Sequence, residues 1–89
     1  MKDCYLEVTY RRGRALGAYY YLHRESDQRS VRTRRVEPGL VIDYAADNSP
    51  IGIEITAPSK LSVEALNVVL HDLGYPDVSQ ADLAPLQAA

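Results

Sequence analysis

The sequence predicts an α+β fold: an antiparallel β-meander of four to five strands with a C-terminal α-helix packed on one face. Two patterns carry this prediction. Within residues 4–56, apolar and polar side chains alternate with the two-residue period of half-buried strands. Within residues 62–74, apolar side chains recur at the spacing of a helix. The strands come first and the helix last, so the sheet is expected to present one apolar face to that helix.

The length and composition fit one ordinary globular domain spanning residues 1–89. Apolar residues make up 46% of the chain and charged residues 25%, which excludes collagen-like, low-complexity and wholly disordered proteins. No apolar run approaches the roughly 20 residues of a membrane-spanning helix, and residues 1–5 do not resemble a signal peptide. Cys4 is the single cysteine, so it cannot form an internal disulfide or assemble a thiolate metal site. We therefore expect a soluble cytoplasmic protein that makes no contact with membranes.

Three strands are expected in the first 36 residues. Residues 4–10 alternate in polarity and form the first strand, which ends at a turn over residues 11–14. Residues 18–23 alternate in the same way and form the second strand. Residues 30–36, rich in arginine and β-branched side chains, form the third strand.

Two further strands follow a tight turn. Residues 37–40 read Glu-Pro-Gly-Leu, which suits a turn because proline fixes φ and glycine accepts a positive φ. The fourth and fifth strands are expected at residues 40–44 and 51–55, with a second turn over residues 47–50.

The alternation of apolar and polar residues selects the register of the last two strands, because it fixes the parity, that is, which alternate residues share a face. A slip by one residue would scatter their apolar side chains over both faces of the sheet. The favoured register gathers all six on one face: Leu40, Ile42, Tyr44, Ile51, Ile53 and Ile55. The same parity places Asp43 and Glu54 together on the opposite face.

The hairpin before these strands has a less consistent register. Pairing Glu37 with Leu40 places Arg35 opposite Ile42 on the apolar face and leaves Val36 on the polar face. We therefore expect a β-bulge nearby.

The second and third strands are expected to be neighbours through a hairpin that pairs Arg24 with Arg29. In this register Tyr19 lies opposite Arg34. Tyr21 then lies opposite Arg32, which yields two aromatic–guanidinium pairs.

The helix has identifiable ends. Ser62 is the expected N-cap, and Leu61 with Leu66 forms a hydrophobic staple across it. Gly74 is a good residue just after the last turn, and a proline two positions later prevents continuation. A short second helix or turn is expected over residues 79–86.

Three segments carry a more specific pattern: Tyr-Tyr-Tyr-Leu at residues 19–22, Val-Glu-Pro-Gly-Leu-Val-Ile-Asp-Tyr at 36–44 and Ile-Gly-Ile-Glu-Ile at 51–55. Together they resemble the small prokaryotic family called domain of unknown function 2283. The resemblance spans residues 8–60, and its middle segment is the most specific. The chain departs from the family at Arg11, where the family often has an aspartate, and in its longer C-terminal helix. The resemblance implies a compact fold but no activity, ligand or catalytic residue.

Asp43 and Glu54 come nearest to a catalytic carboxylate pair. General acid–base catalysis needs a cleft that separates the two pKa values, and a flat sheet face offers none. We interpret Asp43 instead as the partner of Arg34 in a solvated salt ladder.

Metal and cofactor chemistry also lack support in the sequence. His23 and Glu25 share a strand face, and His71 lies on the helix, but a zinc site needs three or four protein ligands. We find no glycine-rich phosphate loop, nucleophile elbow or Cys-x-x-Cys motif. The sequence predicts no enzyme, no metal and no cofactor.

The expected outer sheet face is the candidate interaction surface, with six residues: Tyr19, Tyr21, Arg32, Arg34, Asp43 and Glu54. We predict a non-enzymatic protein-interaction module that self-associates and regulates a partner protein. The alternative is a weak single-stranded nucleic-acid binder that stacks bases on the tyrosines. A third interpretation is a solvated face whose charges satisfy one another. Nucleic acid is the less favoured ligand because the two carboxylates would repel phosphates.

The distribution of charge along the chain and the apolar area of the sheet both concern association with other molecules. Residues 1–36 carry a net charge of +5 and residues 37–89 a net charge of −7, a split that suits either internal neutralisation or a basic binding surface. Five strands make a sheet about 19 Å wide, whereas one helix covers only about 10–12 Å. We therefore expect a homodimer or higher oligomer that buries the rest of the apolar face.

Overall fold

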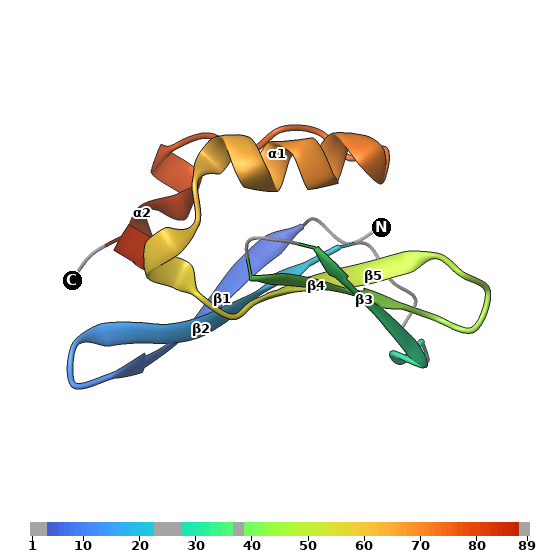
Figure 1. Ribbon diagram of the computed structural model, residues 1–89, viewed down its shortest axis with the longest axis horizontal. Helices are drawn as coiled ribbons and strands as arrows, with labels where there is room; N and C mark the ends of the chain where they lie inside the picture. Colours follow the sequence, from blue (N-terminus) through green and yellow to red (C-terminus); the bar gives the residue numbers. More distant parts are fainter. Residues whose placement is uncertain (1–3, 23–27, 37–38, 88–89) are drawn as a thin grey trace.

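The computed structural model describes residues 4–22, 28–36 and 39–87, which form one antiparallel sheet with helices on a single face (Figure 1). The predicted α+β class is confirmed. The elements in chain order are β1 (Tyr5–Arg11), β2 (Arg14–Tyr21), β3 (Arg32–Val36), β4 (Leu40–Tyr44), β5 (Pro50–Ile55), the 3₁₀ turn η1 (Pro58–Lys60), α1 (Val63–Asp72), the 3₁₀ turn η2 (Ala81–Leu83) and α2 (Ala84–Gln87).

The spatial order of the strands is β1-β2-β5-β4-β3, so the predicted pairing of the second strand with the third is wrong. β2 lies beside β5 instead, with Tyr19 opposite Glu54 and Tyr21 opposite Gly52. The physical reason is burial. Residues 51–53 of β5 are buried on both faces, as a central strand requires, whereas four of the five residues of β3 are exposed. Charged side chains suit the strand at the edge of a sheet.

The register of β3 against β4 differs by one residue from the prediction. Val36 pairs with Leu40 and Arg34 with Ile42, so Arg34 does not face Asp43. This register turns Val36 toward the core and Arg35 away from it, which removes the conflict that suggested a bulge. The pairing runs without irregularity along β3, while Arg24 and Glu37, used to set the predicted registers, lie outside the described residues.

The predicted parity of β4 and β5 is confirmed. Leu40 pairs with Ile55 and Ile42 with Ile53. All six apolar side chains assigned to one face are buried. A shift in register between Asp43 and Tyr44 accommodates the end of the hairpin.

Helix α1 lies across this apolar face, hereafter the inner face (Figure 1). The Ser62 hydroxyl accepts a hydrogen bond from the Ala65 N–H at 3.1 Å, as expected of the N-cap. Leu66, Val69 and Leu70 are buried against the sheet. Gly74 follows the helix with φ of +83°, a conformation that glycine adopts without a Cβ clash.

The C-terminal segment covers a second part of the inner face. Leu83 and Leu86 are buried in the same core as the sheet, and the Tyr10 hydroxyl donates a hydrogen bond to the Pro85 carbonyl at 2.7 Å. The inner face is therefore covered within the chain more fully than a single helix would allow. Oligomerisation remains an expectation, but uncovered inner-face area no longer supports it. No helix among the described residues has the length and apolar character needed to cross a membrane.

Candidate interaction surface

The structure divides the six candidate residues between the two faces of the sheet. Tyr19, Tyr21, Asp43 and Glu54 lie on the face opposite the helices, hereafter the outer face, as the strand registers require. The two arginines belong to the other face, because Arg34 pairs with the inward-facing Ile42 and Arg32 with Tyr44. The expected stacking of Tyr19 and Tyr21 on these arginines is wrong.

Arg32 and Arg34 contact Tyr44 instead. The Arg34 Nε donates a hydrogen bond to the Tyr44 hydroxyl at 3.2 Å, and the Arg32 guanidinium lies 4.2 Å from the centre of the Tyr44 ring. The hydrogen bond to Tyr44 raises the pKa of Arg34. Arg34 also reaches Asp72 at 3.8 Å. These contacts tie the edge strand β3 to β4 and to the end of α1, which is a structural role.

Three tyrosines form a continuous cluster on the outer face. The rings of Tyr5 and Tyr21 stack at 4.4 Å between centroids, and Tyr19 meets Tyr21 edge-on at 4.7 Å. Pairs of this kind contribute about 0.5–1.5 kcal/mol each. Tyr5 nevertheless remains 55% exposed. The cluster thus combines a rigid aromatic core with accessible apolar surface.

A glycine lets Tyr19 cross the neighbouring strand. Gly52 is buried, and a Cβ at this position would overlap the ring and hydroxyl of Tyr19. The ring passes over β5, and its hydroxyl donates a hydrogen bond to Asp43 Oδ2 on β4 at 2.6 Å. Asp43 is therefore held by a tyrosine and not by the predicted arginine.

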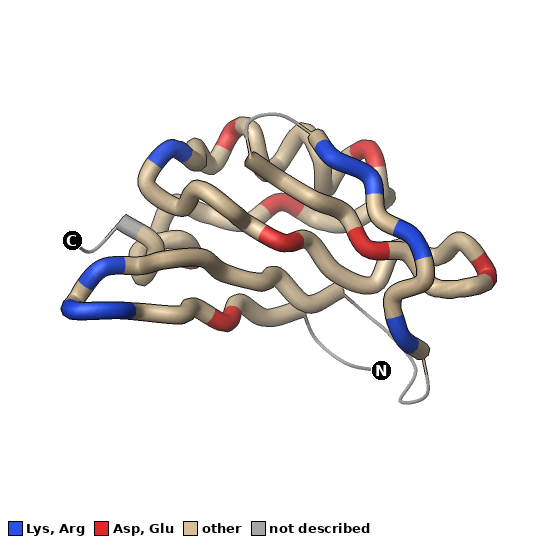
Figure 2. Tube along the Cα trace, turned by 60° about the horizontal axis from the view of Figure 1, so that its bottom comes forward, with Lys and Arg blue, Asp and Glu red and all other residues tan. Residues whose placement is uncertain are grey.

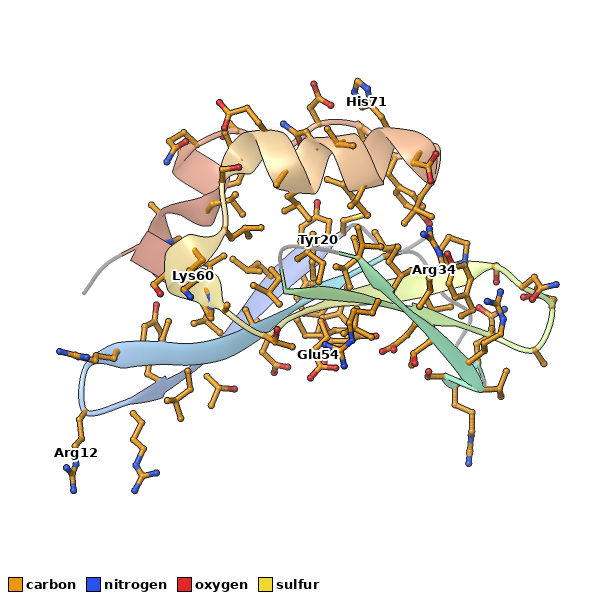
Figure 3. The ribbon with its side chains drawn as sticks, viewed as in Figure 1. Arg12, Tyr20, Arg34, Glu54, Lys60 and His71 are labelled. Carbon is orange, nitrogen blue, oxygen red and sulfur yellow. The ribbon has the colours of Figure 1, made fainter. Side chains whose placement is uncertain are left out.

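Carboxylates surround this cluster. Glu7 and Glu54 lie directly opposite Tyr19, one on each side, and Glu7 accepts a hydrogen bond from the Tyr21 hydroxyl at 2.9 Å. Glu54 makes no hydrogen bond or ion pair with another described residue, and it points away from the helices (Figure 3). Acidic positions run across the middle of the outer face, while basic positions lie at the β1–β2 tip and along β3 (Figure 2).

A shallow groove of about 380 Å³ opens on this face between Glu7 and Glu54. Its other lining residues include Leu16, Gly17 and Tyr19. The carboxylates and the tyrosine ring that line this open groove suit recognition of a cationic or aromatic group.

The remaining candidates form no additional site. Among the described residues, no three histidine, cysteine or acidic side chains are grouped to hold a metal ion. His23 and Glu25 lie outside the described ranges, and the His71 imidazole contacts the carboxylate of Asp77. Cys4 is half-buried and packs against the core.

Residues 18–59 match the sequence model of DUF2283, described as a protein of unknown function. The predicted resemblance is confirmed. The DUF2283 match includes the second half of β2, all of β3, β4 and β5, and part of η1, but not β1 or α1. Comparisons with curated proteins and with solved structures found no significant match. Tyr19, Gly52 and Asp43 thus fall inside the DUF2283-like segment, whereas Tyr5 and Glu7 fall outside it.

Sequence reasoning did not assign Tyr5, Glu7, Leu16 and Gly52 to the site. The alternation of residues 4–10 places Tyr5 and Glu7 on the polar face, so this pattern could have assigned both residues to the site. Gly52 interrupts an isoleucine-rich strand, and such a glycine often marks a close approach of another group. Leu16 carries no comparable signal, because its exposure follows from a register shift in the β1–β2 hairpin.

Proposed function

We propose that the chain is a non-enzymatic protein-interaction module that self-associates through the outer face of its sheet and regulates a partner protein. The observation that carries the proposal is the tyrosine cluster of Tyr5, Tyr19 and Tyr21 on a face that no described helix covers. Tyrosines are favoured at protein interfaces because they bury a large ring with little loss of conformational freedom. The ring contacts within this cluster hold the tyrosines in place before a partner binds, which lowers the conformational entropy lost on binding.

Single-stranded nucleic acid is the weaker alternative. Base stacking on tyrosines needs nearby cations for the phosphates, and the cluster instead borders on Glu7, Asp43 and Glu54. Arg32 and Arg34, the two cations among the six candidate residues, contact Tyr44 on the other side of the sheet. Charge therefore favours a protein over a nucleic acid on this face.

Analytical ultracentrifugation between about 1 and 200 µM tests the proposal. We expect a concentration-dependent dimer or higher oligomer, and we expect Tyr5→Ala to weaken it, because interface aromatics often contribute about 1 kcal/mol or more to binding. Val68→Ala is the matched control, since Val68 is 69% exposed and belongs to α1, on the opposite side of the sheet from the tyrosine cluster. A single species of one-chain mass at every concentration would refute self-association.

A fluorescence titration with a mixed single-stranded oligonucleotide tests the alternative. We expect no binding tighter than about 10 µM at physiological salt, the level that non-specific phosphate contacts provide. A tighter complex that weakens steeply with salt would make nucleic-acid binding the better function.

A further inference from the structure

The β1–β2 hairpin ends in three arginines whose side chains have no partner among the described residues. Arg11, Arg12 and Arg14 are exposed, and their side chains form no hydrogen bond or ion pair with another described residue. Arg12 and Gly13 both take positive φ, of 54° and 80°, which closes the hairpin in a tight turn. Arg12 points away from the body of the protein, on the outer side of the sheet (Figure 3). The basic tip, Arg11 to Arg14, is thus free to contact another molecule.

The groove between Glu7 and Glu54 has the complementary chemistry. Two carboxylates flank the Tyr19 ring, and Glu54 makes no ion pair with any described cation. A guanidinium that enters this groove can pair with a carboxylate and stack on a tyrosine. We call these residues, Glu7, Tyr19 and Glu54, the acidic groove.

Leu16 lies between the basic tip and the acidic groove. The β1–β2 register shifts at Thr9 and Tyr10, which leaves Leu16 without a partner in the Cα register. Leu16 lines the groove and is 54% exposed. An apolar side chain with this exposure, beside complementary charges, is suited to the centre of a contact.

The spacing along β2 fits a two-fold arrangement. Arg14, the first residue of β2, precedes Tyr19 by five residues, which corresponds to about 17 Å of extended strand. Leu16 falls near the midpoint. When two outer faces meet about a two-fold axis through Leu16, the basic tip of each copy lies over the acidic groove of the other. Such an isologous contact satisfies both charge clusters at once.

We infer that the occupant of the acidic groove is the basic tip of a second copy of this chain, with Leu16 of both copies at the two-fold axis. This inference rests on the proposed self-association through the outer face. It assigns a role to the uneven charge of the chain: the same protomer supplies a basic tip and an acidic groove.

A charge-reversal exchange tests the inference. One variant combines Arg12→Glu with Arg14→Glu, and the other combines Glu7→Lys with Glu54→Lys. Each variant alone is expected to self-associate at least about tenfold more weakly than the wild type, because like charges then face each other. An equimolar mixture is expected to form heterodimers, since each tip then meets a groove of opposite charge.

The matched control reverses two other exposed cations, Arg29→Glu with Lys60→Glu, which changes the net charge equally without touching the tip or the groove. It is expected to dimerise like the wild type in the same ultracentrifugation series. A mixture that stays monomeric while the wild type dimerises would overturn the inference and leave the proposed function standing. A monomeric wild type would refute the proposed self-association itself.

Oxidative crosslinking supplies a second measurement that does not depend on charge. In a Cys4→Ala background, Leu16→Cys is expected to form a disulfide-linked dimer readily, because residues beside a two-fold axis meet their own copies. Val68→Cys is the exposed control and should crosslink much more slowly. Equal crosslinking of the two variants would contradict the placement of Leu16 at the axis.

Discussion

The side chain of Tyr19 lies over Gly52 and occupies the space that a Cβ at residue 52 would need. The two residues are diagonal neighbours on β2 and β5, and the glycine opens a path for the tyrosine ring across β5. At the far end of that path the Tyr19 hydroxyl donates a hydrogen bond to Asp43 at 2.6 Å. Because Gly52 has no side chain, Tyr19 of β2 can cross β5 and bind Asp43 of β4.

Gly52→Ala should destabilise the protein by about 1–3 kcal/mol, because the added methyl group displaces the Tyr19 ring and breaks its hydrogen bond to Asp43. Urea unfolding followed by circular dichroism measures this loss. Gly17→Ala is the control, since a Cβ there meets only the Ile55 carbonyl at an ordinary 3.5 Å. In a Tyr19→Ala background the cost of Gly52→Ala should largely disappear. A cost that is unchanged in that background would show that another contact is responsible.

Asn67→Ala should loosen the C-terminal segment and cost about 1–3 kcal/mol. The Asn67 side chain accepts a hydrogen bond from the Val78 N–H at 2.8 Å and donates one to the Val78 carbonyl at 3.1 Å. Val78 is buried, so the substitution leaves two backbone groups without partners. Amide hydrogen exchange measures this effect. Relative to the wild type, Asn67→Ala should accelerate exchange more over residues 78–86 than in β4 and β5.

Asn67→Asp provides the graded comparison for this prediction. The aspartate retains an acceptor for the Val78 N–H but offers no donor to the Val78 carbonyl. Its exchange rates should fall between those of the wild type and Asn67→Ala. Uniform acceleration across the sheet in either variant would indicate global destabilisation and contradict a local anchoring role.

Alkaline pH should destabilise the protein through Tyr20. Burial, followed by the nearby Cys4 side chain, raises the pKa of Tyr20 from 10.0 to about 12. The unfolded chain therefore releases this proton near pH 10, while the folded chain holds it until about pH 12. The linked stabilisation is fully present below pH 10 and is lost as the pH rises to 12.

Urea unfolding of the wild type and of Tyr20→Phe, measured from pH 8 to pH 12, isolates this effect. Every other side chain is common to both proteins, so its contribution cancels in the comparison. The free energy of unfolding should fall more steeply for the wild type above pH 10. Parallel curves for the two proteins would exclude Tyr20 as the group responsible.

The sequence predicted the β4–β5 hairpin correctly because local and tertiary preferences agree there. Leu40 and Ile42 share a parity with Ile53 and Ile55, and only one parity buries them all. The capping of α1 by Ser62 was predictable for a similar reason, since a single hydroxyl interacts with a backbone N–H three residues away.

The pairing of β2 with β5 could not be derived from adjacency in the chain. Consecutive strands usually pair, and this tendency favoured the incorrect β2–β3 hairpin. The evidence against it lay in composition. The arginines of β3 suit an edge, and the run Ile51, Gly52, Ile53 suits a strand buried on both faces.

The candidate site was predicted only in part, because one of the two registers that define it was predicted correctly and the other was not. Asp43 and Glu54 were placed correctly on one face, because the β4–β5 register was correct. Arg32 and Arg34 were misplaced by a one-residue shift against β4, and a shift of that size turns every side chain of a strand to the opposite face.

The position of β5 beside β2 also determines the order in which the chain can fold. The β1–β2 and β4–β5 hairpins join neighbouring segments and can form early, within microseconds. Tyr21 and Gly52 are about 30 residues apart in the chain, so their pairing must overcome the entropy of closing a long loop. We therefore expect docking of the two hairpins along the β2–β5 seam to be the slow step. Substitutions at that seam should slow folding, whereas those in β3 should mainly accelerate unfolding.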